Sequence, residues 1–239
     1  MSIPKTFTRN FLALCACVGL AASASASASA VAATSVAADA TLRAISGAKP
    51  IDRLVPAKTA LLVIDFQNEY FTGRLPIPDG AQALANTQRL IAFADQTKMP
   101  VYHIQHVAPA DSPLFALGGE GVKFHPDMQP RAGDITLQKS TVSAFGSTDL
   151  DRRLKKAGID TLIISGLMTH ACVAGAARDA APLGYNVVVA ADASATRNIL
   201  RANGTVIDKD SLHNAALAEV EDTFGSVLTT AEILELKIR

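Results

Sequence analysis

The chain has 239 residues, of which 49% are hydrophobic and 18% charged, and its 22 basic residues balance 22 acidic ones. This balance, with no run of basic residues, excludes an extended phosphate-binding surface and argues against nucleic acid as a partner. The length and hydrophobic content are sufficient for one globular domain with a sizeable core.

Residues 1–33 have the pattern of a secretory signal peptide. Lys5 and Arg9 supply its positive start, residues 11–22 are apolar, and small residues over 21–33 offer cleavage points. The apolar stretch is shorter than the roughly twenty residues that cross a membrane. We therefore expect export, with a bacterial periplasm as the compartment, and no membrane attachment once the leader is removed.

An N-terminal extension is expected over residues 34–57, followed by the domain over residues 58–239. Apolar runs predict parallel strands that are buried on both faces, at residues 59–65, 101–107, 135–139, 160–165, 185–191 and 226–229. Helical patterns alternate with these strands, at residues 79–99, 149–157, 169–183, 211–223 (with Ser211 as the N-cap) and from 230 onward. This alternation predicts an α/β fold, a three-layer αβα sandwich around a mainly parallel sheet. The Pro- and Gly-rich segment 108–134 is expected to be a long functional loop.

Cys172 is the only cysteine outside the predicted leader, so no partner exists for an internal disulfide. It follows an apolar strand that breaks at Gly166, which places the thiol near the amide groups at the start of a helix. The positive field of those amides favours the thiolate and predicts a nucleophile. The alternative is a small, buried hydrophobic residue.

Asp65, Lys139 and Asp192 also fall at the carboxyl ends of predicted strands. Parallel strands share this edge, where the chemistry of such sheets is found. A carboxylate there can accept the proton of the Cys172 thiol, and a lysine can orient that carboxylate. Amide groups near Met168 and Cys172 are candidates for stabilising an oxyanion. The alternatives are a turn or helix cap for Asp65, a solvated strand end for Lys139 and a loop cap for Asp192.

The histidines do not form a metal-binding pattern. His103 and His106 are three residues apart on a predicted strand and so face opposite sides of the sheet. The zinc motifs H-E-x-x-H and paired C-x-x-C, the G-x-S-x-G elbow and the G-x-G-x-x-G turn are all missing from the sequence. We therefore expect no metal and no cofactor. His106 is a candidate for lining the site, and a structural role is the alternative for it and for His170 and His213.

Three blocks resemble the isochorismatase-like cysteine hydrolases. Residues 61–71, Leu-Leu-Val-Ile-Asp-Phe-Gln-Asn-Glu-Tyr-Phe, are similar to the signature of their first strand. Lys139-Ser140 with Phe145 and residues 148–150 resembles the second block, and Gly-Leu-Met-Thr-His-Ala-Cys-Val at 166–173 resembles the third. The similarity extends from about residue 58 to the C-terminus.

The resemblance implies a Rossmann-like fold with about six parallel strands and a catalytic triad of Asp65, Lys139 and Cys172. It also implies a non-proline cis peptide bond between Leu167 and Met168, which aims the amides of Met168 and Cys172 at the substrate oxygen. The family's nicotinamidases carry a metal site after the first block. Thr-Gly-Arg-Leu-Pro stands there instead, which argues against that activity and against a metal.

Together these features predict a hydrolase that cleaves an amide-type carbon–nitrogen bond of a small molecule through a thioester on Cys172. The residues predicted to shape the substrate pocket are Gln67, Asn68, Phe71, His106, Phe145 and His170. The alternatives are isochorismatase-type cleavage of a vinyl ether, whose enzymes typically lack the cysteine, and a non-catalytic thiol-sensing or binding protein. Alanine-rich helices and the resemblance indicate a homo-oligomer, a dimer or a tetramer.

Overall fold

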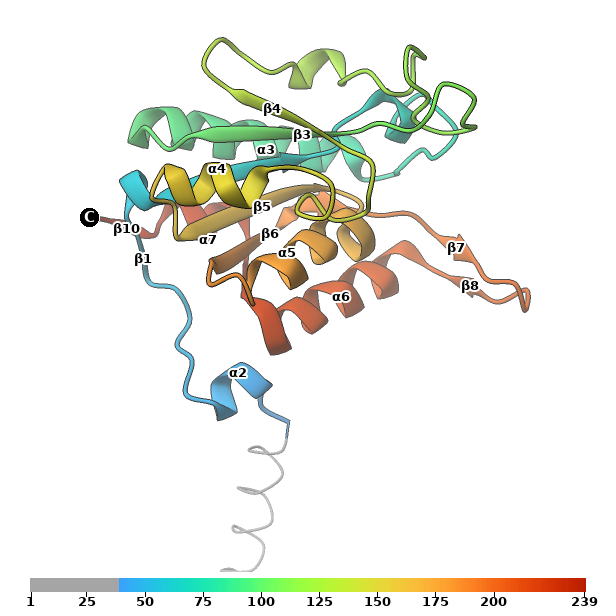
Figure 1. Cartoon of the computed structure of the whole chain (residues 1–239). Coiled ribbons are helices and arrows are strands. Elements are labelled where there is room, and N and C mark those ends of the chain that lie inside the picture. Colours follow the sequence, from blue (N-terminus) through green and yellow to red (C-terminus); the bar gives the residue numbers. More distant parts are fainter. Residues whose placement is uncertain (1–38) are drawn as a thin grey trace, which may run out of the picture. The chain divides into compact units, whose positions relative to one another are not determined.

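Six parallel strands form the main sheet of the protein (Figure 1). The computed structural model describes residues 39–239, so the predicted signal peptide at residues 1–33 lies outside the described residues. The strands are β2 (Thr59–Ile64), β3 (Val101–His106), β4 (Ile135–Lys139), β5 (Thr161–Leu167), β6 (Asn186–Ala195) and β9 (Ser226–Leu228). They lie in the order β4-β3-β2-β5-β6-β9, and every adjacent pair is parallel. The predicted α/β fold class is confirmed.

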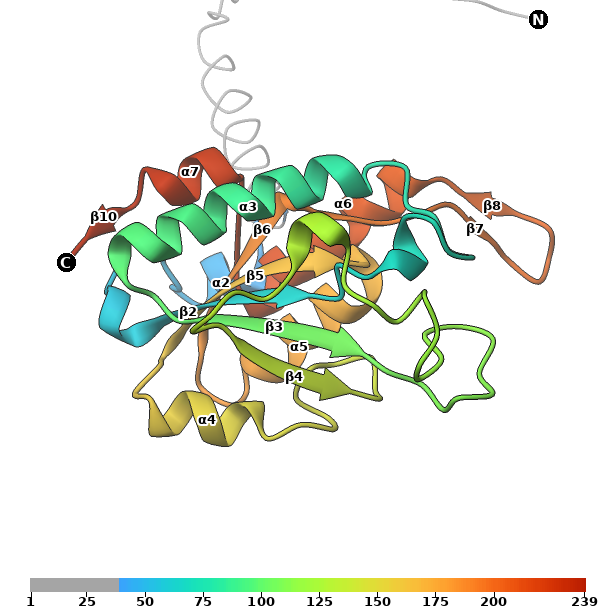
Figure 2. The same ribbon diagram turned by 90° about the horizontal axis from the view of Figure 1, so that it is seen from above.

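Helices cover both faces of this sheet, which makes three layers (Figure 2). One face packs against α3 (Gly80–Thr97) and α7 (Thr230–Leu234), the other against α4 (Leu150–Lys156), α5 (Ala174–Ala180) and α6 (Lys209–Glu219). Alternate residues of β2 enter the two cores, Leu61 and Val63 on the α3 side and Leu62 and Ile64 on the α4 side. Both faces are buried, so this strand is a continuous apolar run.

The predicted N-terminal extension contributes to the folded unit. Contacts define one compact unit over Thr41–Arg239, which starts before the domain boundary expected at residue 58. Within it, β1 (Arg53–Leu54) pairs in parallel with β10 (Lys237–Ile238), and Leu54 is buried in the core. Short helices α2 (Leu42–Ile45) and η1 (Pro56–Lys58) flank β1.

The expected start of the helix at residue 211 and the expected end of the strand at residue 191 are wrong. The helix α6 begins at Lys209, because the Asp208 carboxylate accepts hydrogen bonds from the backbone amides of Asp210 and Ser211. Asp208, rather than Ser211, is therefore its N-cap. The strand β6 continues past Asp192 to Ala195 instead of ending at residue 191, because Ser194 and Ala195 pair with the end of β5.

Other short elements were not expected from the sequence. The strands β7 (Ile199–Leu200) and β8 (Val206–Ile207) pair as an antiparallel hairpin that projects from the body of the folded unit (Figure 2). Single helical turns η2 (Asn68–Tyr70) and η3 (Pro126–Met128) lie in the connections. The turns η4 (Thr169–Val173) and η5 (Val220–Phe224) instead overlap the helices expected over residues 169–183 and 211–223. Among residues 39–239, no helix has the length and apolar content needed to cross a membrane.

Gly166 allows β5 to lie against β2 at the edge of the sheet that carries the predicted site. Its φ is 147°, and a Cβ at this position would overlap the carbonyl oxygen of Ile64. The register between β5 and β6 shifts between Ile164 and Gly166. The chain can leave β5 in this direction only because residue 166 has no side chain.

We predict that Gly166→Ala destabilises the protein by about 3 kcal/mol, because it adds overpacking to backbone strain. The free energy of unfolding from urea titration measures the effect. Gly184→Ala is the matched control, since Gly184 also has positive φ, 93°, but has no atom within 4 Å of the added Cβ. Strain alone should cost about 1 kcal/mol there. Equal losses in the two variants would contradict the close-packing explanation.

Candidate active site

The three predicted triad residues come from three different strand ends. Asp65 follows β2, Lys139 is the last residue of β4, and Cys172 lies in the turn η4 after β5. In the sheet order, β3 lies between β4 and β2, and β5 lies next to β2. All these strands are parallel, so their carboxyl ends share one edge of the sheet.

The Lys139 ammonium joins the other two residues. Its Nζ lies 2.7 Å from Asp65 Oδ2 and 3.3 Å from Cys172 Sγ. The Asp65 and Lys139 side chains are fully buried, and Cys172 is only 6% exposed. The structure therefore brings the acid, the ammonium and the thiol of the predicted triad into direct contact.

Burial controls the protonation of the acid and the thiol. It raises the pKa of the Asp65 carboxyl, and the Lys139 ammonium opposes that rise. Burial also raises the pKa of the Cys172 thiol, the Asp65 carboxylate adds to the rise, and Lys139 opposes it. The expected preference for thiolate at rest was wrong, because desolvation and the neighbouring carboxylate outweigh the favourable charges. The thiol keeps its proton until a base removes it.

Asp65 is placed to be that base. Its backbone has a φ of 55°, an unusual value for a residue other than glycine. Within residues 39–239, neither carboxylate oxygen has a partner with good hydrogen-bond geometry apart from the ion pair with Lys139. A carboxylate with free acceptor capacity next to a neutral thiol can take the thiol proton.

The turn that carries Cys172 has the backbone that the resemblance implies. The peptide bond between Leu167 and Met168 is cis, and η4 (Thr169–Val173) follows it as a π-helical turn. Two side chains of this turn are hydrogen-bonded to neighbouring elements. Thr169 Oγ1 lies 2.8 Å from His213 Nδ1, and His170 Nδ1 lies 2.7 Å from Thr196 Oγ1. Stabilisation of an oxyanion by the amides of Met168 and Cys172 stays a prediction.

Gln67 and Asn68, predicted to contact substrate, hold the protein's own backbone. Gln67 is fully buried, and its Nε2 donates to the carbonyl oxygens of His106 at 2.8 Å and Val122 at 2.7 Å. Its Oε1 accepts from the amide of His106 at 2.7 Å. The backbone N–H of Asn68 donates to the carbonyl oxygen of Lys123 at 2.9 Å. These bonds fasten the 108–134 loop and the end of β3 beside Asp65.

The aromatic candidates lie in separate places. The Phe71 ring packs on His125, with 4.3 Å between ring centroids, and Phe145 packs near Tyr185 at 6.0 Å. Phe145 therefore belongs to the core on the α4 side of the sheet. Contacts of these residues with a substrate stay predictions.

Glu69, which the sequence did not single out, anchors the 108–134 loop. This glutamate is 5% exposed, its Oε1 accepts from the amide of Arg74 at 2.7 Å, and its own amide donates to the carbonyl oxygen of Gly121 at 2.9 Å. A Cβ at Gly121 would collide with its carboxylate. The sequence signal for this role was a glutamate within the mostly apolar block 61–71, together with a glycine-rich segment at 108–134.

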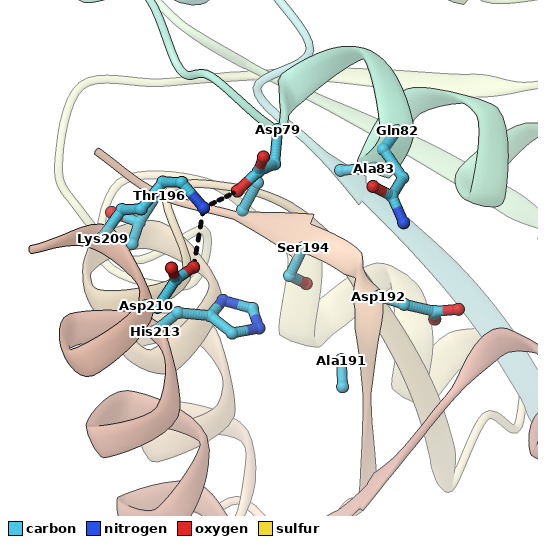
Figure 3. A pocket seen from close by; sticks show the side chains of 11 residues that line it. Asp79, Gln82, Ala83, Ala191, Asp192, Ser194, Thr196, Lys209, Asp210 and His213 are labelled. Atoms are coloured by element: carbon cyan, nitrogen blue, oxygen red, sulfur yellow. Dashed lines mark hydrogen bonds and ion pairs between the residues drawn. The ribbon is translucent and has the colours of Figure 1, made fainter. Parts of the chain in front are cut away.

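A separate cavity of about 180 Å³ is shown in Figure 3. Residues from the start of α3, the end of β6 and the start of α6 line it, and none of the three triad residues does. Lys209 bonds both Asp79, at 2.6 Å, and Asp210, at 2.7 Å, across this cavity. His213 lines this cavity and is hydrogen-bonded to Thr169 of the η4 turn. His213 therefore connects the cavity wall to the turn that carries Cys172.

A family model of the isochorismatase domain matches residues 59–232. The chain belongs to the isochorismatase family. The secreted isochorismatase effector Isc1 of Verticillium dahliae is 32% identical to it, over 75% of this chain and 95% of that protein. The maleamate amidohydrolase of Pseudomonas putida is 28% identical, over 74% of this chain and 86% of that protein.

Solved structures of isochorismatase-family proteins have the same fold. A crystal structure of an isochorismatase from Pseudomonas putida superposes with a TM-score of 0.75 at 31% identity, covering 80% of this chain and 97% of that one. A cysteine hydrolase from Pseudomonas syringae gives a TM-score of 0.73 at 25% identity, covering 78% and 96%. The protein is a hydrolase of the isochorismatase family.

We predict that His106 makes the stability of this hydrolase fall as the solution becomes acidic. Burial and the Lys139 charge lower the pKa of His106 from 6.5 to about 4. Between these values the unfolded chain binds a proton that the folded protein does not. The contribution of His106 to the free energy of unfolding therefore falls from about pH 6.5 downward and is fully lost below about pH 4. Urea titrations across this range should show a shallower decline for His106→Asn. Parallel declines in the two proteins would contradict the assignment.

Proposed function

We propose that this isochorismatase-family protein hydrolyses an amide-type carbon–nitrogen bond of a small molecule through a thioester on Cys172. One observation carries the proposal, the buried ammonium of Lys139 in contact with both the Asp65 carboxylate and the Cys172 sulfur. The alternative roles, a solvated strand end for Lys139 and a purely hydrophobic core residue for Cys172, do not require a buried ammonium next to the sulfur. An acid, an ammonium and a thiol that share a buried edge of a sheet are suited to nucleophilic catalysis.

In the first half of the reaction, Asp65 takes the thiol proton as Cys172 attacks the substrate carbonyl carbon. The resulting oxyanion is held by the amides of Met168 and Cys172. As this intermediate collapses, the carbon–nitrogen bond breaks and Asp65 returns its proton to the departing nitrogen. An amine leaves, and an acyl group remains on the sulfur.

In the second half, Asp65 accepts a proton from water as the water oxygen attacks the thioester carbon. The carbon–sulfur bond breaks, the acid leaves, and the proton on Asp65 goes back to the thiolate. Lys139 stays charged throughout and stabilises whichever of Asp65 and Cys172 carries the negative charge. A raised pKa suits Asp65 to this alternation, since a strong acid would not hold a proton between the two steps.

The choice of carbon–nitrogen over ether cleavage follows from the cysteine. A thiol in reach of a base forms an acyl intermediate, whereas hydrolysis of a vinyl ether needs a proton on the substrate and no sulfur nucleophile. The name of the maleamate amidohydrolase relative gives further support for an amide substrate. The predicted absence of a metal or cofactor is kept in this proposal.

We predict that Cys172→Ser and Cys172→Ala each lower turnover at least about a hundredfold on any amide that the protein hydrolyses. A panel of small amides, with isochorismate as a vinyl ether control, identifies the substrate by product analysis. Unfolding titrations of both variants check that the fold is kept. Mass spectrometry of the quenched wild-type enzyme should find an acyl group on Cys172. Near wild-type turnover by Cys172→Ala, or cleavage of isochorismate alone, would refute the mechanism.

We also propose that the protein is exported, with cleavage of residues 1–33. The support is the pattern of Lys5, Arg9, the apolar stretch 11–22 and the small-residue tract that follows, together with the name of the secreted relative. We predict that cell fractionation recovers the protein outside the cytoplasm and that its intact mass lacks about thirty residues. Leader-retaining protein in the cytosol would contradict this proposal, and an Arg9→Glu leader variant serves as the export-impaired control.

A homo-oligomer, a dimer or a tetramer, remains our proposal for the quaternary state. Leu200 and Val206 on the projecting β7–β8 hairpin are 71% and 57% exposed. A two-stranded hairpin with exposed apolar side chains gains stability when another surface covers it.

A further inference from the structure

The Lys139 ammonium has more acceptors around it than protons to donate. Besides Asp65 Oδ2 and Cys172 Sγ, its Nζ lies 3.0 Å from His106 Nδ1 and 3.3 Å from the carbonyl oxygen of Thr141. An ammonium group carries three N–H bonds at fixed angles, and these rotate together about the bond from Cε to Nζ. A hydrogen bond that fixes the direction of one N–H bond therefore also sets the directions of the other two.

His106 is the better placed of the two extra acceptors. It pairs with Lys139 in the register of β3 and β4, so the two side chains leave neighbouring strands at the same level. Its backbone is held on both sides by the Gln67 amide, at 2.7 and 2.8 Å. Its ring also packs edge-on against Phe115, with 5.0 Å between centroids. Gln67 therefore holds the backbone of His106, and Phe115 packs against its ring.

The ammonium determines which nitrogen of His106 carries the ring proton. Lysine only donates, so Nδ1 must accept and the proton sits on Nε2. A doubly protonated ring would have no acceptor and would repel Lys139. In agreement, burial and the Lys139 charge lower the pKa of His106 to about 4, and the ring is neutral in near-neutral solution.

We propose that His106 is a positioning residue whose Nδ1 fixes the rotation of the Lys139 ammonium, so that the other two protons point at Asp65 and at the Cys172 sulfur. The inference rests on the proposed function and deepens it. No proton passes to His106 in any step, and the thiol proton still goes to Asp65. His106 acts on Lys139 in this proposal, and the contact with substrate expected from the sequence stays a prediction.

Without the Nδ1 acceptor, the ammonium is expected to rotate toward the carbonyl oxygen of Thr141. The proton that faces the Cys172 sulfur then moves away from it. Hydrogen bonds to charged groups contribute enough that the loss of alignment should slow thiolate reactions roughly tenfold or more. The effect should appear in kcat rather than in KM, because the bond to Lys139 aligns a reacting group and does not bind the substrate.

Two substitutions separate the acceptor from the ring. His106→Phe keeps an aromatic ring against Phe115 but has no acceptor, whereas His106→Asn loses the ring and places Oδ1 near the position of Nδ1. Alkylation of Cys172 by iodoacetamide gives a readout that needs no substrate. In protein without residues 1–33 this is the single cysteine, and Cys172→Ala supplies the blank.

We predict that His106→Phe slows alkylation and lowers kcat roughly tenfold or more, with KM nearly unchanged, and shifts the pH profile of alkylation to higher pH. His106→Asn should stay within about threefold of wild type. His106→Leu is a second variant without an acceptor, in case the phenylalanine does not fold. Unfolding titrations of each variant accompany the kinetic measurements.

The results distinguish the possible failures. Equal alkylation rates in all variants would overturn the positioning role, and so would equal slowing in His106→Asn and His106→Phe, which would assign the effect to ring packing. If no amide is hydrolysed but alkylation still differs between the two variants, the positioning role stands and the proposed function fails. If an amide is hydrolysed but the variants do not differ, the proposed function stands and the positioning role fails.

Discussion

The site depends on one buried ion pair. Lys139 and Asp65 lie 2.7 Å apart with both side chains fully shielded from solvent. Removing two charges from water is costly, and their attraction compensates only when the geometry is good and further polar partners surround them. Lys139 has such partners in His106, Thr141 and the sulfur of Cys172. Burial keeps solvent from screening the ammonium, and this makes its charge effective on the thiol.

The parallel sheet makes this pair possible. The strand β3 separates β4 from β2, so Lys139 must reach across the end of β3 to meet Asp65. The residue at that end is His106, and β3 therefore supplies an acceptor at the point where the lysine side chain crosses it. On the other side of β2, Gly166 lets β5 come close enough for the η4 turn to present Cys172. The four adjacent strands each provide one part of the arrangement.

Two polar side chains of the first-strand signature, those of Gln67 and Glu69, contact other parts of the protein itself. Gln67 binds the backbone of His106 and Val122, and Glu69 fits against Gly121. Through these residues the long loop after β3 is attached beside Asp65. A signature can therefore identify a family while most of its polar side chains serve to fix loops, since buried polar groups must be paired.

The sequence alone determined the fold class, the strand pattern and the identity of the acid, the lysine and the cysteine. Continuous apolar runs are the mark of strands buried on both faces, and residues at their ends must share an edge. It did not determine the contacts of Gln67 and His106, the raised pKa of Cys172, the N-cap at Asp208 or the β7–β8 hairpin. These depend on which backbone groups approach from distant segments and on how far water is excluded. Only the tertiary structure sets those distances, because neither burial nor contact across strands is a local property of the chain.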